Sequence, residues 1–405
     1  MKRSLLTGIM LTMVSGACSQ HRELDLTPFT PSLKANNQRA WFEHVQPHPE
    51  ELGWTLWNWN PQLAAAARLA SASDQPLLLW LENGHPLGST SKAGSERRYW
   101  WMNPDLNATV ARFVVAADDI HVLHRAQSAE GALFTTLVEQ TPDQGAALLR
   151  NGGVLMASAS GKLLGSYCRE DGAALKDELR AALANWDKLP RGERCLVELG
   201  AMVSDGRSAD FFPDDGLALE VHRRLLAATL DLDAPRYLPY THDYLWFSAT
   251  EVAQMIPTKM GQTLIVPPAQ AQRLALFTMV DDLQGDGQAF ATEDLLPSNL
   301  TFTSISKIGN TLRFAAHGEF AASSKTHNMR CVMEGLGSVN LAQKSILSLN
   351  LVVQAQSWGS AIEPLADGSW PLLGMSFHRA DSVEGSHRIA PAQFDQYPAS
   401  WPVTE

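Results

Sequence analysis

The first half of the chain shows apolar runs of strand length separated by helical patterns. Leu77–Leu81 is a continuous apolar run that predicts a buried strand, and Phe113–Ala117 predicts a second one. An Asn60-Pro61 start followed by Ala-rich sequence to Ala72 predicts a helix before the first strand. Asn103-Pro104 repeats this signal and predicts a short helix that leads into the second strand. This alternation is typical of an α/β domain.

A hairpin and an amphipathic helix are predicted to close this domain. A helical stretch is expected around Gln144–Arg150, and Val154–Ser158 and Lys162–Tyr167 then flank a Gly-containing turn. Asp171 is expected to cap a helix whose apolar positions share one face: Leu175, Leu179, Leu183 and Trp186. Leu189-Pro190-Arg191-Gly192 then ends the pattern and marks a domain boundary.

The second half changes its period from helical to strand-like. We predict helices over Leu217–Leu230 and Pro267–Met279, and a further helix opened by a capping box from Ser248 to Glu251. From Asn299 the period becomes two. Gly309-Asn310 is a hairpin turn signal, and the alternating positions Leu347, Leu349, Leu351, Val353 and Ala355 predict a half-buried strand. We therefore expect an α+β domain with an antiparallel sheet.

The N-terminus has the layout of a bacterial export signal. Met1-Lys2-Arg3 is followed by apolar Leu5–Val14 and small residues before Cys18. Two interpretations remain open: a lipobox that would lipidate Cys18 and anchor the chain to the outer membrane, or cleavage by an ordinary signal peptidase and secretion. The expected organisation is a signal at 1–18, a tether and lead-in at 19–56, an α/β domain at 57–189 and the second domain at 195–405.

Composition is ordinary for a globular protein, with 45% hydrophobic and 19% charged residues. The formal net charge of −11 disfavours nucleic acid or an anionic membrane surface as the main partner. The sequence shows no clustered basic stretch that would oppose this conclusion. The partners we expect are the membrane through a lipid anchor at Cys18, and a protein or peptide.

The order of elements in the first domain resembles the thioredoxin fold. The resemblance extends over about Trp57 to Leu189 and depends on the central strand, the closing hairpin and the last helix. It implies that Gly84-His85-Pro86-Leu87 stands where the family has its C-x-x-C pair, so that only the Pro is kept. Gly152-Gly153 stands where the family has a cis-Pro. The second domain resembles the C-terminal part of exported two-domain bacterial proteins of unknown function, in phrases such as Asp243–Phe247 and Pro371–Phe377.

The missing thiols decide what this domain is expected to do. Disulfide exchange needs a thiolate at a helix N-terminus, and neither Gly84 nor Leu87 supplies one. Ser89 is the local hydroxyl and His85 the local base, and we favour a purely structural loop over a working pair of these two. The former active-site loop is therefore a candidate binding site comprising Gly84, His85, Pro86, Leu87 and Ser89.

The remaining candidates are interpreted mainly as structural. Asp118, Asp119, His121 and His124 have metal-like spacing but are expected to cap and solvate a strand end. Cys168 and Cys195 are candidates for a disulfide, which leaves Cys331 as a buried thiol. Asp281 and Asp282 follow a predicted helix and could act with Asp243 and Glu251 as paired acids for hydrolysis, but a solvated helix end is favoured. His317, His327, His378 and His387 lack ligand spacing, so no metal and no cofactor is predicted.

Two classes of function follow from these observations. We favour a non-catalytic binding or scaffold protein of the cell envelope with a redox-inactive thioredoxin-like domain. The alternative is an enzyme, either a thiol-disulfide oxidoreductase that uses a non-standard Cys or a hydrolase that uses acids of the C-terminal domain.

Overall fold

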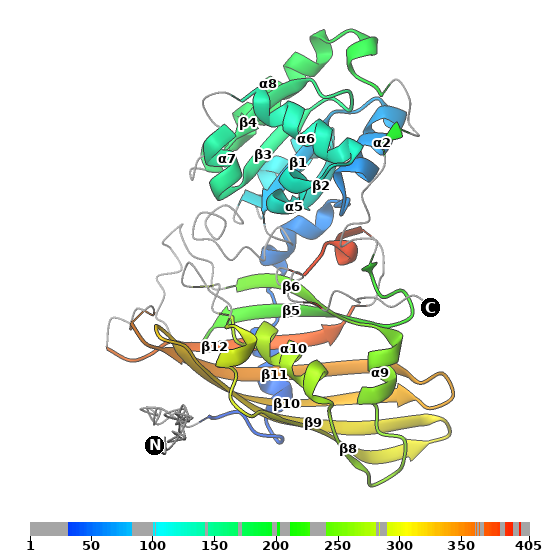
Figure 1. Ribbon diagram of the computed structural model, residues 1–405, viewed down its shortest axis with the longest axis vertical. Coiled ribbons are helices and arrows are strands. Elements are labelled where there is room, and N and C mark those ends of the chain that lie inside the picture. Colours follow the sequence, from blue (N-terminus) through cyan, green and yellow to red (C-terminus); the bar gives the residue numbers. More distant parts are fainter. Residues whose placement is uncertain are drawn as a thin grey trace, which may run out of the picture.

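The computed structural model contains two separate sheets, one above the other in Figure 1. It describes residues 31–82, 100–101, 103–141, 145–168, 172–196, 201–202, 211–226, 240–280, 283, 290–360, 362, 364, 368–380, 385–391 and 397. Cys18, the loop from Gly84 to Ser89, Asp171 and the pair Asp281-Asp282 lie outside these residues. Within the described part, no helix combines the length and the apolar character needed to cross a bilayer.

The first sheet has four strands in the order β2-β1-β3-β4. Strand β1 runs parallel to β2 and antiparallel to β3, and β3 and β4 form the predicted hairpin. The bounds are β1 Leu77–Glu82, β2 Val114–Asp119, β3 Gly153–Ala157 and β4 Leu163–Tyr167. All the strands predicted for this half are therefore confirmed.

Helices cover both faces of this sheet because the strands are apolar on both sides. One face packs on the helix before β1 and on the helices between β2 and β3, and the other packs on the short helix before β2, the last helix and a group of Trp rings. The bounds are α2 Leu63–Ser73, η3 Pro104–Leu106, α4 Asn107–Val110, α5 Ile120–Arg125, α6 Ala129–Glu139, α7 Gly145–Asn151, η4 Gly172–Ala174, α8 Leu175–Lys188 and η5 Arg191–Glu193. The apolar stripe predicted for α8 is buried as expected.

The second sheet is antiparallel and has eight strands in the order β6-β5-β12-β11-β10-β9-β8-β7. Its bounds are β5 Leu217–Leu225, β6 Tyr240–Phe247, β7 Thr263–Ile265, β8 Asn299–Ile308, β9 Thr311–Ser323, β10 Asn328–Asn340, β11 Ser345–Trp358 and β12 Leu372–Arg379. The helical segments of this half are α9 Ala249–Met255, α10 Pro268–Thr278, η8 Thr292–Asp294 and η9 Gly385–Arg388. Helices α9 and α10 pack on the apolar face of the sheet.

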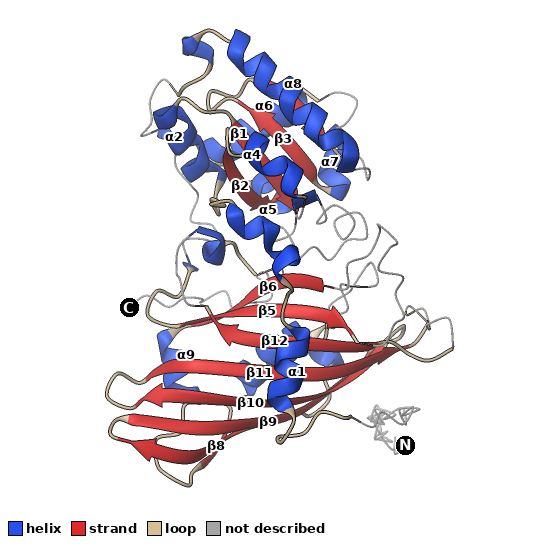
Figure 2. Cartoon of the chain, turned by 180° about the vertical axis from the view of Figure 1, so that it is seen from behind, coloured by secondary structure: helices blue, strands red, loops and turns tan. Residues whose placement is uncertain are grey.

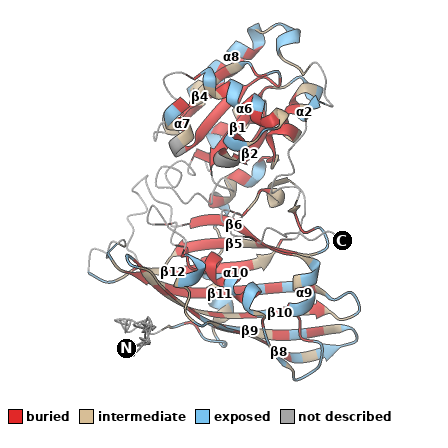
Figure 3. Ribbon diagram, in the orientation of Figure 1, coloured by how far each residue is buried: buried red, intermediate tan, exposed pale blue. Residues whose placement is uncertain are grey.

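The helix predicted over Leu217–Leu230 is wrong. Leu217–Leu225 is strand β5, in which Leu219 and Val221 face the apolar core and Glu220 and His222 alternate with them. Because charged side chains on the alternate positions are also shielded, almost the whole strand is inaccessible to solvent (Figure 3). The other two predicted helices are confirmed as α9 and α10, and the Ser248–Glu251 capping box is present.

The lead-in at 19–56 is more than a tether where it is described. Residues Gln38–Val45 form α1, which crosses the face of β11 and β12 opposite α9 and α10 (Figure 2). Residues Pro49–Leu56 form η1, which leads up to the first sheet. Trp57 and Trp59 pack there with Trp101. Residues 38–59, which we call the strap, thus contact both sheets.

Leu347 departs from the predicted alternation. The β10–β11 register shifts between Ser338 and Val339, so that Ser338 faces Ser348 while Val339 faces Ile346. Leu347 is the extra residue of this bulge and is 41% exposed, whereas Ile346 takes the core position. A bulge shifts the period by one residue, which a strict alternation cannot anticipate.

Candidate metal centre

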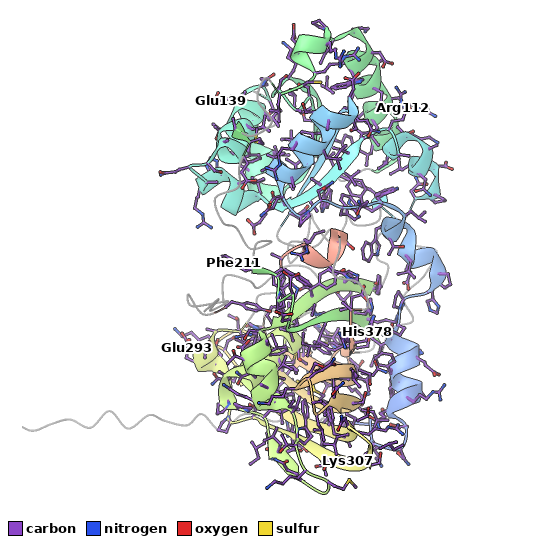
Figure 4. The ribbon with its side chains drawn as sticks, turned by 90° about the vertical axis from the view of Figure 1, so that its right-hand side faces the viewer. Arg112, Glu139, Phe211, Glu293, Lys307 and His378 are labelled. Carbon is purple, nitrogen blue, oxygen red and sulfur yellow. The ribbon has the colours of Figure 1, made fainter. Side chains whose placement is uncertain are left out.

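One face of β5, β6 and β12 carries polar side chains in register. Glu220 of β5 lies directly between Tyr244 of β6 and His378 of β12. Two residues further along, His222 lies opposite His242 on β6. Alternate residues of a strand share a face, so these side chains project together from the sheet. The face is the one that carries the strap, and His378 is seen beside it in Figure 4.

The side chains form two adjacent groups of contacts, one around Nδ1 of His222 and the other around the carboxylate of Glu220. Nδ1 of His222 lies 2.9 Å from the Tyr240 hydroxyl and 3.2 Å from Nδ1 of His242. Glu220 lies 2.5 Å from Nε2 of His378 and 3.8 Å from Nε2 of His242. His387 of η9 brings its Nε2 to 3.9 Å from the same carboxylate. Four histidines and one carboxylate are thus assembled from three strands and a short helical turn.

Glu220, His222 and His242 lie close enough together to be candidate metal ligands. One ligand atom from each lies within 4.8 Å of those of the other two. Two nitrogen ligands of one tetrahedral ion, each about 2.0–2.1 Å from the metal, are separated by roughly 3.3–3.4 Å. The 3.2 Å between the two Nδ1 atoms is close to this spacing, although it is also the length of a long hydrogen bond.

Burial sets the protonation of the cluster. Removal from water lowers the pKa of His222 to about 3, so its imidazole is neutral at physiological pH. Burial alone would raise the pKa of Glu220, but the hydrogen bond from His378 and the neighbouring histidines outweigh it and hold that pKa below its usual value. Burial also raises the pKa of both Tyr240 and Tyr244. A neutral imidazole beside an ionised carboxylate is the state in which both groups bind a cation.

The strap forms one wall of the cluster. The ring of Trp54 lies 4.6 Å from that of His242, and Tyr240 belongs to the same apolar cluster as Trp57 and Trp101. Two residues after His222 on β5, Arg224 forms a buried ion pair with Glu51 of the strap. The cluster therefore lies where the strap and the end strands of the eight-stranded sheet meet.

Most site residues predicted from sequence do not take part in this cluster. Gly84, His85, Pro86, Leu87 and Ser89 lie outside the described residues, as does Cys18. The Asp118 carboxylate accepts hydrogen bonds from the Leu63 and Asp119 amides, which agrees with the capping role predicted for it. Asp243 is buried beside Arg223, and Glu251 pairs with Arg273 and caps α9, so both acids are structural.

The Cys168–Cys195 disulfide is absent from the structure. Cys195 Sγ lies 3.9 Å from a carboxylate oxygen of Asp74, just before β1 begins. Cys168 lies at the other end of β1, where a Cβ on Gly153 would come within 3.1 Å of it. The length of β1 between these ends is roughly 13 Å, far more than a disulfide spans. Cys331 is buried on β10, as predicted.

This cluster was not predicted from the sequence, and the expectation that His378 and His387 are scattered is wrong, because both adjoin Glu220. The available signals were Glu220-x-His222 and Tyr240-x-His242-x-Tyr244, which place polar groups on one face of a strand. The helix predicted over Leu217–Leu230 concealed the first. His378 and His387 reach Glu220 only through the sheet order, because β12 pairs with β5 across more than 140 residues of sequence.

Comparison of the chain with protein-family models, with curated proteins and with solved structures gives no match.

Proposed function

We propose that this chain is a metal-binding protein of the cell envelope, in which Glu220, His222 and His242 hold one divalent transition-metal ion. The observation that carries the proposal is the convergence of these three ligand atoms within 4.8 Å of one another in a shielded site. His378 and His387 adjoin the same carboxylate and are available to orient it or to complete the coordination.

The chemistry of the donors sets the class of ion. Imidazole nitrogen with one carboxylate suits zinc, copper, nickel or iron, whereas Ca²⁺ and Mg²⁺ prefer sites made of oxygen ligands. His222 and His242 are almost inaccessible, and the Glu220 side chain retains 18% of its exposure. Access to the site is therefore from the side of Glu220, His378 and His387. Such a shielded site favours retention of the ion over rapid exchange.

The test is metal binding by the full chain after treatment with a chelator. Titration with Zn²⁺ by calorimetry is expected to give one site per chain, and Co²⁺ should give visible bands of a tetrahedral or five-coordinate N/O site. His222→Gln and His242→Gln should each weaken Zn²⁺ binding by about 100-fold or more. His317→Gln is the matched control, because His317 pairs with Glu334 at 3.0 Å on the exposed face of the same sheet. Unchanged binding by the double variant at positions 222 and 242 would exclude this site.

We further propose that the four-stranded domain is a thioredoxin-like domain without a thiol pair. The strand order β2-β1-β3-β4, the parallel β1–β2 pair and helix α8 after the hairpin all support this assignment. Gly152 and Gly153 have positive φ values of 78° and 149°, and there is no cis peptide bond in the described residues. The backbone before β3 therefore differs from the cis-Pro segment of a thiol-exchange site, which supports a domain without thiol exchange.

Of the three cysteines that the structure describes, Cys168 alone lies at the end of β1 that leads on to Gly84 in sequence. It is the residue on which the alternative oxidoreductase function would depend. The hydrolase alternative is weakened, because Asp243 and Glu251 are both engaged by buried arginines.

Export and lipidation complete the proposal and are supported by the Met1–Cys18 pattern alone. The mass of the mature N-terminal peptide distinguishes a lipidated Cys18 from simple signal cleavage. An uncleaved Met1 in the native host would contradict export.

A further inference from the structure

Three turns lie together at one end of the eight-stranded sheet. They are the β8–β9 hairpin around Gly309, the β10–β11 hairpin at 340–345 and the loop at 258–263 that precedes β7. The amide of Leu341 donates to the carbonyl of Asn310 at 2.9 Å, which joins the first two turns. The amide of Ser304 donates to the carbonyl of Gln262 at 2.9 Å, which joins the third turn to β8. Residues 258–263, 305–313 and 338–348 are called the basic tip below; they lie at the lower right of Figure 1.

The basic tip exposes large apolar side chains. Ile308 is 79% exposed, Met260 55% and Ile305 46%. Ile305 lies at the register shift between Ser304 and Ser306, and Leu347 is the bulged residue of β11. Two separate bulges therefore turn apolar side chains outward at the same end of the sheet. A group of exposed apolar side chains at one place is typical of an interaction surface.

The charge of the basic tip is opposite to that of the chain. Lys259, Lys307, Arg313 and Lys344 are exposed there, and the three segments contain no Asp or Glu. The chain as a whole has a formal net charge of −11. These cations come from three separate segments, so no basic run is visible in the sequence, and the expected absence of a basic face does not hold at this end.

We propose that the basic tip docks on the surface of an anionic phospholipid bilayer. Each Lys or Arg close to such a surface strengthens binding by roughly fivefold, and exposed apolar side chains add to it by entering the headgroup boundary. Ile308 and Met260 are the most exposed large apolar side chains of the basic tip, and the four cations belong to the same three segments. This proposal does not depend on the metal centre, which lies among β6, β5 and β12, the first three strands in the order of the sheet.

The experiment uses the full chain carrying Cys18→Ser, so that acylation does not contribute. Vesicles of phosphatidylcholine alone are compared with vesicles that contain one third phosphatidylglycerol, and hydrogen exchange is followed along the chain. Protection confined to the basic tip, present only with phosphatidylglycerol and reduced by 0.5 M salt, is the expected result. Protection of the first 30 residues alone, or equal protection with both vesicles, would overturn the proposal.

Two variants separate charge from insertion. Lys259→Gln combined with Lys307→Gln and Lys344→Gln should weaken vesicle binding by at least about tenfold. Ile308→Ser should weaken it with little change in salt dependence, because it removes only an apolar group. Lys325→Gln at the opposite hairpin is the matched control and should bind like the unchanged chain. Equal loss in the control and in the triple variant would also contradict docking by the basic tip.

Discussion

Arg224 of β5 forms a bidentate ion pair with Glu51 of the strap through its two terminal Nη atoms, across 173 residues of sequence. Its Nη1 lies 3.1 Å from Oε1 and its Nη2 lies 2.5 Å from Oε2. The same guanidinium donates to the carbonyl of Gln46 at 3.0 Å and lies 5.6 Å from the ring of Tyr240. The pair thus fixes the strap on the strand that also carries Glu220 and His222.

Removing one partner of this buried pair should destabilise the protein strongly. We expect Glu51→Gln to lower the free energy of unfolding by about 3–5 kcal/mol, because Arg224 keeps a buried charge without its counter-ion. Urea unfolding followed by Trp fluorescence measures the effect. Asp177→Asn, in an exposed pair with Arg180, is the control and should be nearly neutral. A Glu51→Gln protein as stable as this control would show that the strap is not fixed by the pair.

Metal loading should raise the thermal stability of the chain. A ligand that binds only the folded state at 100 times its Kd stabilises it by about 2.7 kcal/mol. Differential scanning fluorimetry with increasing Zn²⁺ should show a rising Tm that a chelator reverses. His222→Gln should abolish the rise and His317→Gln should keep it. A similar rise in both variants would assign the effect to non-specific binding.

Cys331 gives the chain a defined loss of stability at high pH. Burial raises the pKa of its thiol well above the ordinary value, so the folded state keeps the proton while the unfolded state loses it above about pH 9. Stability is therefore present below pH 9 and falls above it, by about 1.4 kcal/mol per pH unit from this group. Cys331→Val should flatten that slope in denaturant unfolding between pH 8.5 and 10.5. Parallel slopes for both proteins would mean that the thiol titrates in the folded state.

The ring of Phe314 on the neighbouring strand occupies the space that a side chain at position 337 would need, so this position requires Gly337. The two residues are paired in register, and a Cβ on Gly337 would come within 2.3 Å of the ring. Gly337→Ala should destabilise the eight-stranded sheet by about 1–3 kcal/mol, because the ring must move in a packed core. Gly192→Ala, where a Cβ has open space, is the control. Thermal unfolding of the two variants distinguishes them, and equal Tm values would refute the clash.

The thioredoxin-like assignment predicts the absence of thiol exchange. The purified mature protein should show no turnover in insulin reduction or peroxide assays, because the proposed assignment puts Gly84 and Leu87 where the family has its thiol pair. Cys168→Ser is the informative variant. Turnover that this substitution removes would identify Cys168 as a non-standard catalytic thiol and would contradict a redox-inactive domain.

The predictions from sequence succeeded where structure is decided locally. The Ser248–Glu251 capping box, the Gly309–Asn310 turn and the apolar stripe of α8 all depend on residues a few positions apart, and all are present. The pairing of Cys168 with Cys195 failed, because it required two distant ends of a sheet to meet. The helix predicted over Leu217–Leu230 failed for a different reason. The buried charged side chains of β5 are paired only with residues elsewhere in the chain.

The sequence by itself indicated an α/β half and a half with an antiparallel sheet, because apolar runs and alternation mark many of the strands and Pro and Gly mark their ends. It also determined that no cysteine lies between Cys18 and Cys168, since that depends only on which residues are present. The tertiary structure alone decided the candidate metal centre and the basic tip. Glu220, His242 and His378 meet only because β5 pairs with both β6 and β12. Lys259, Lys307 and Lys344 come to one end of the sheet only because their three turns lie there. Strand order is set by packing over the whole sheet, and no local pattern encodes it.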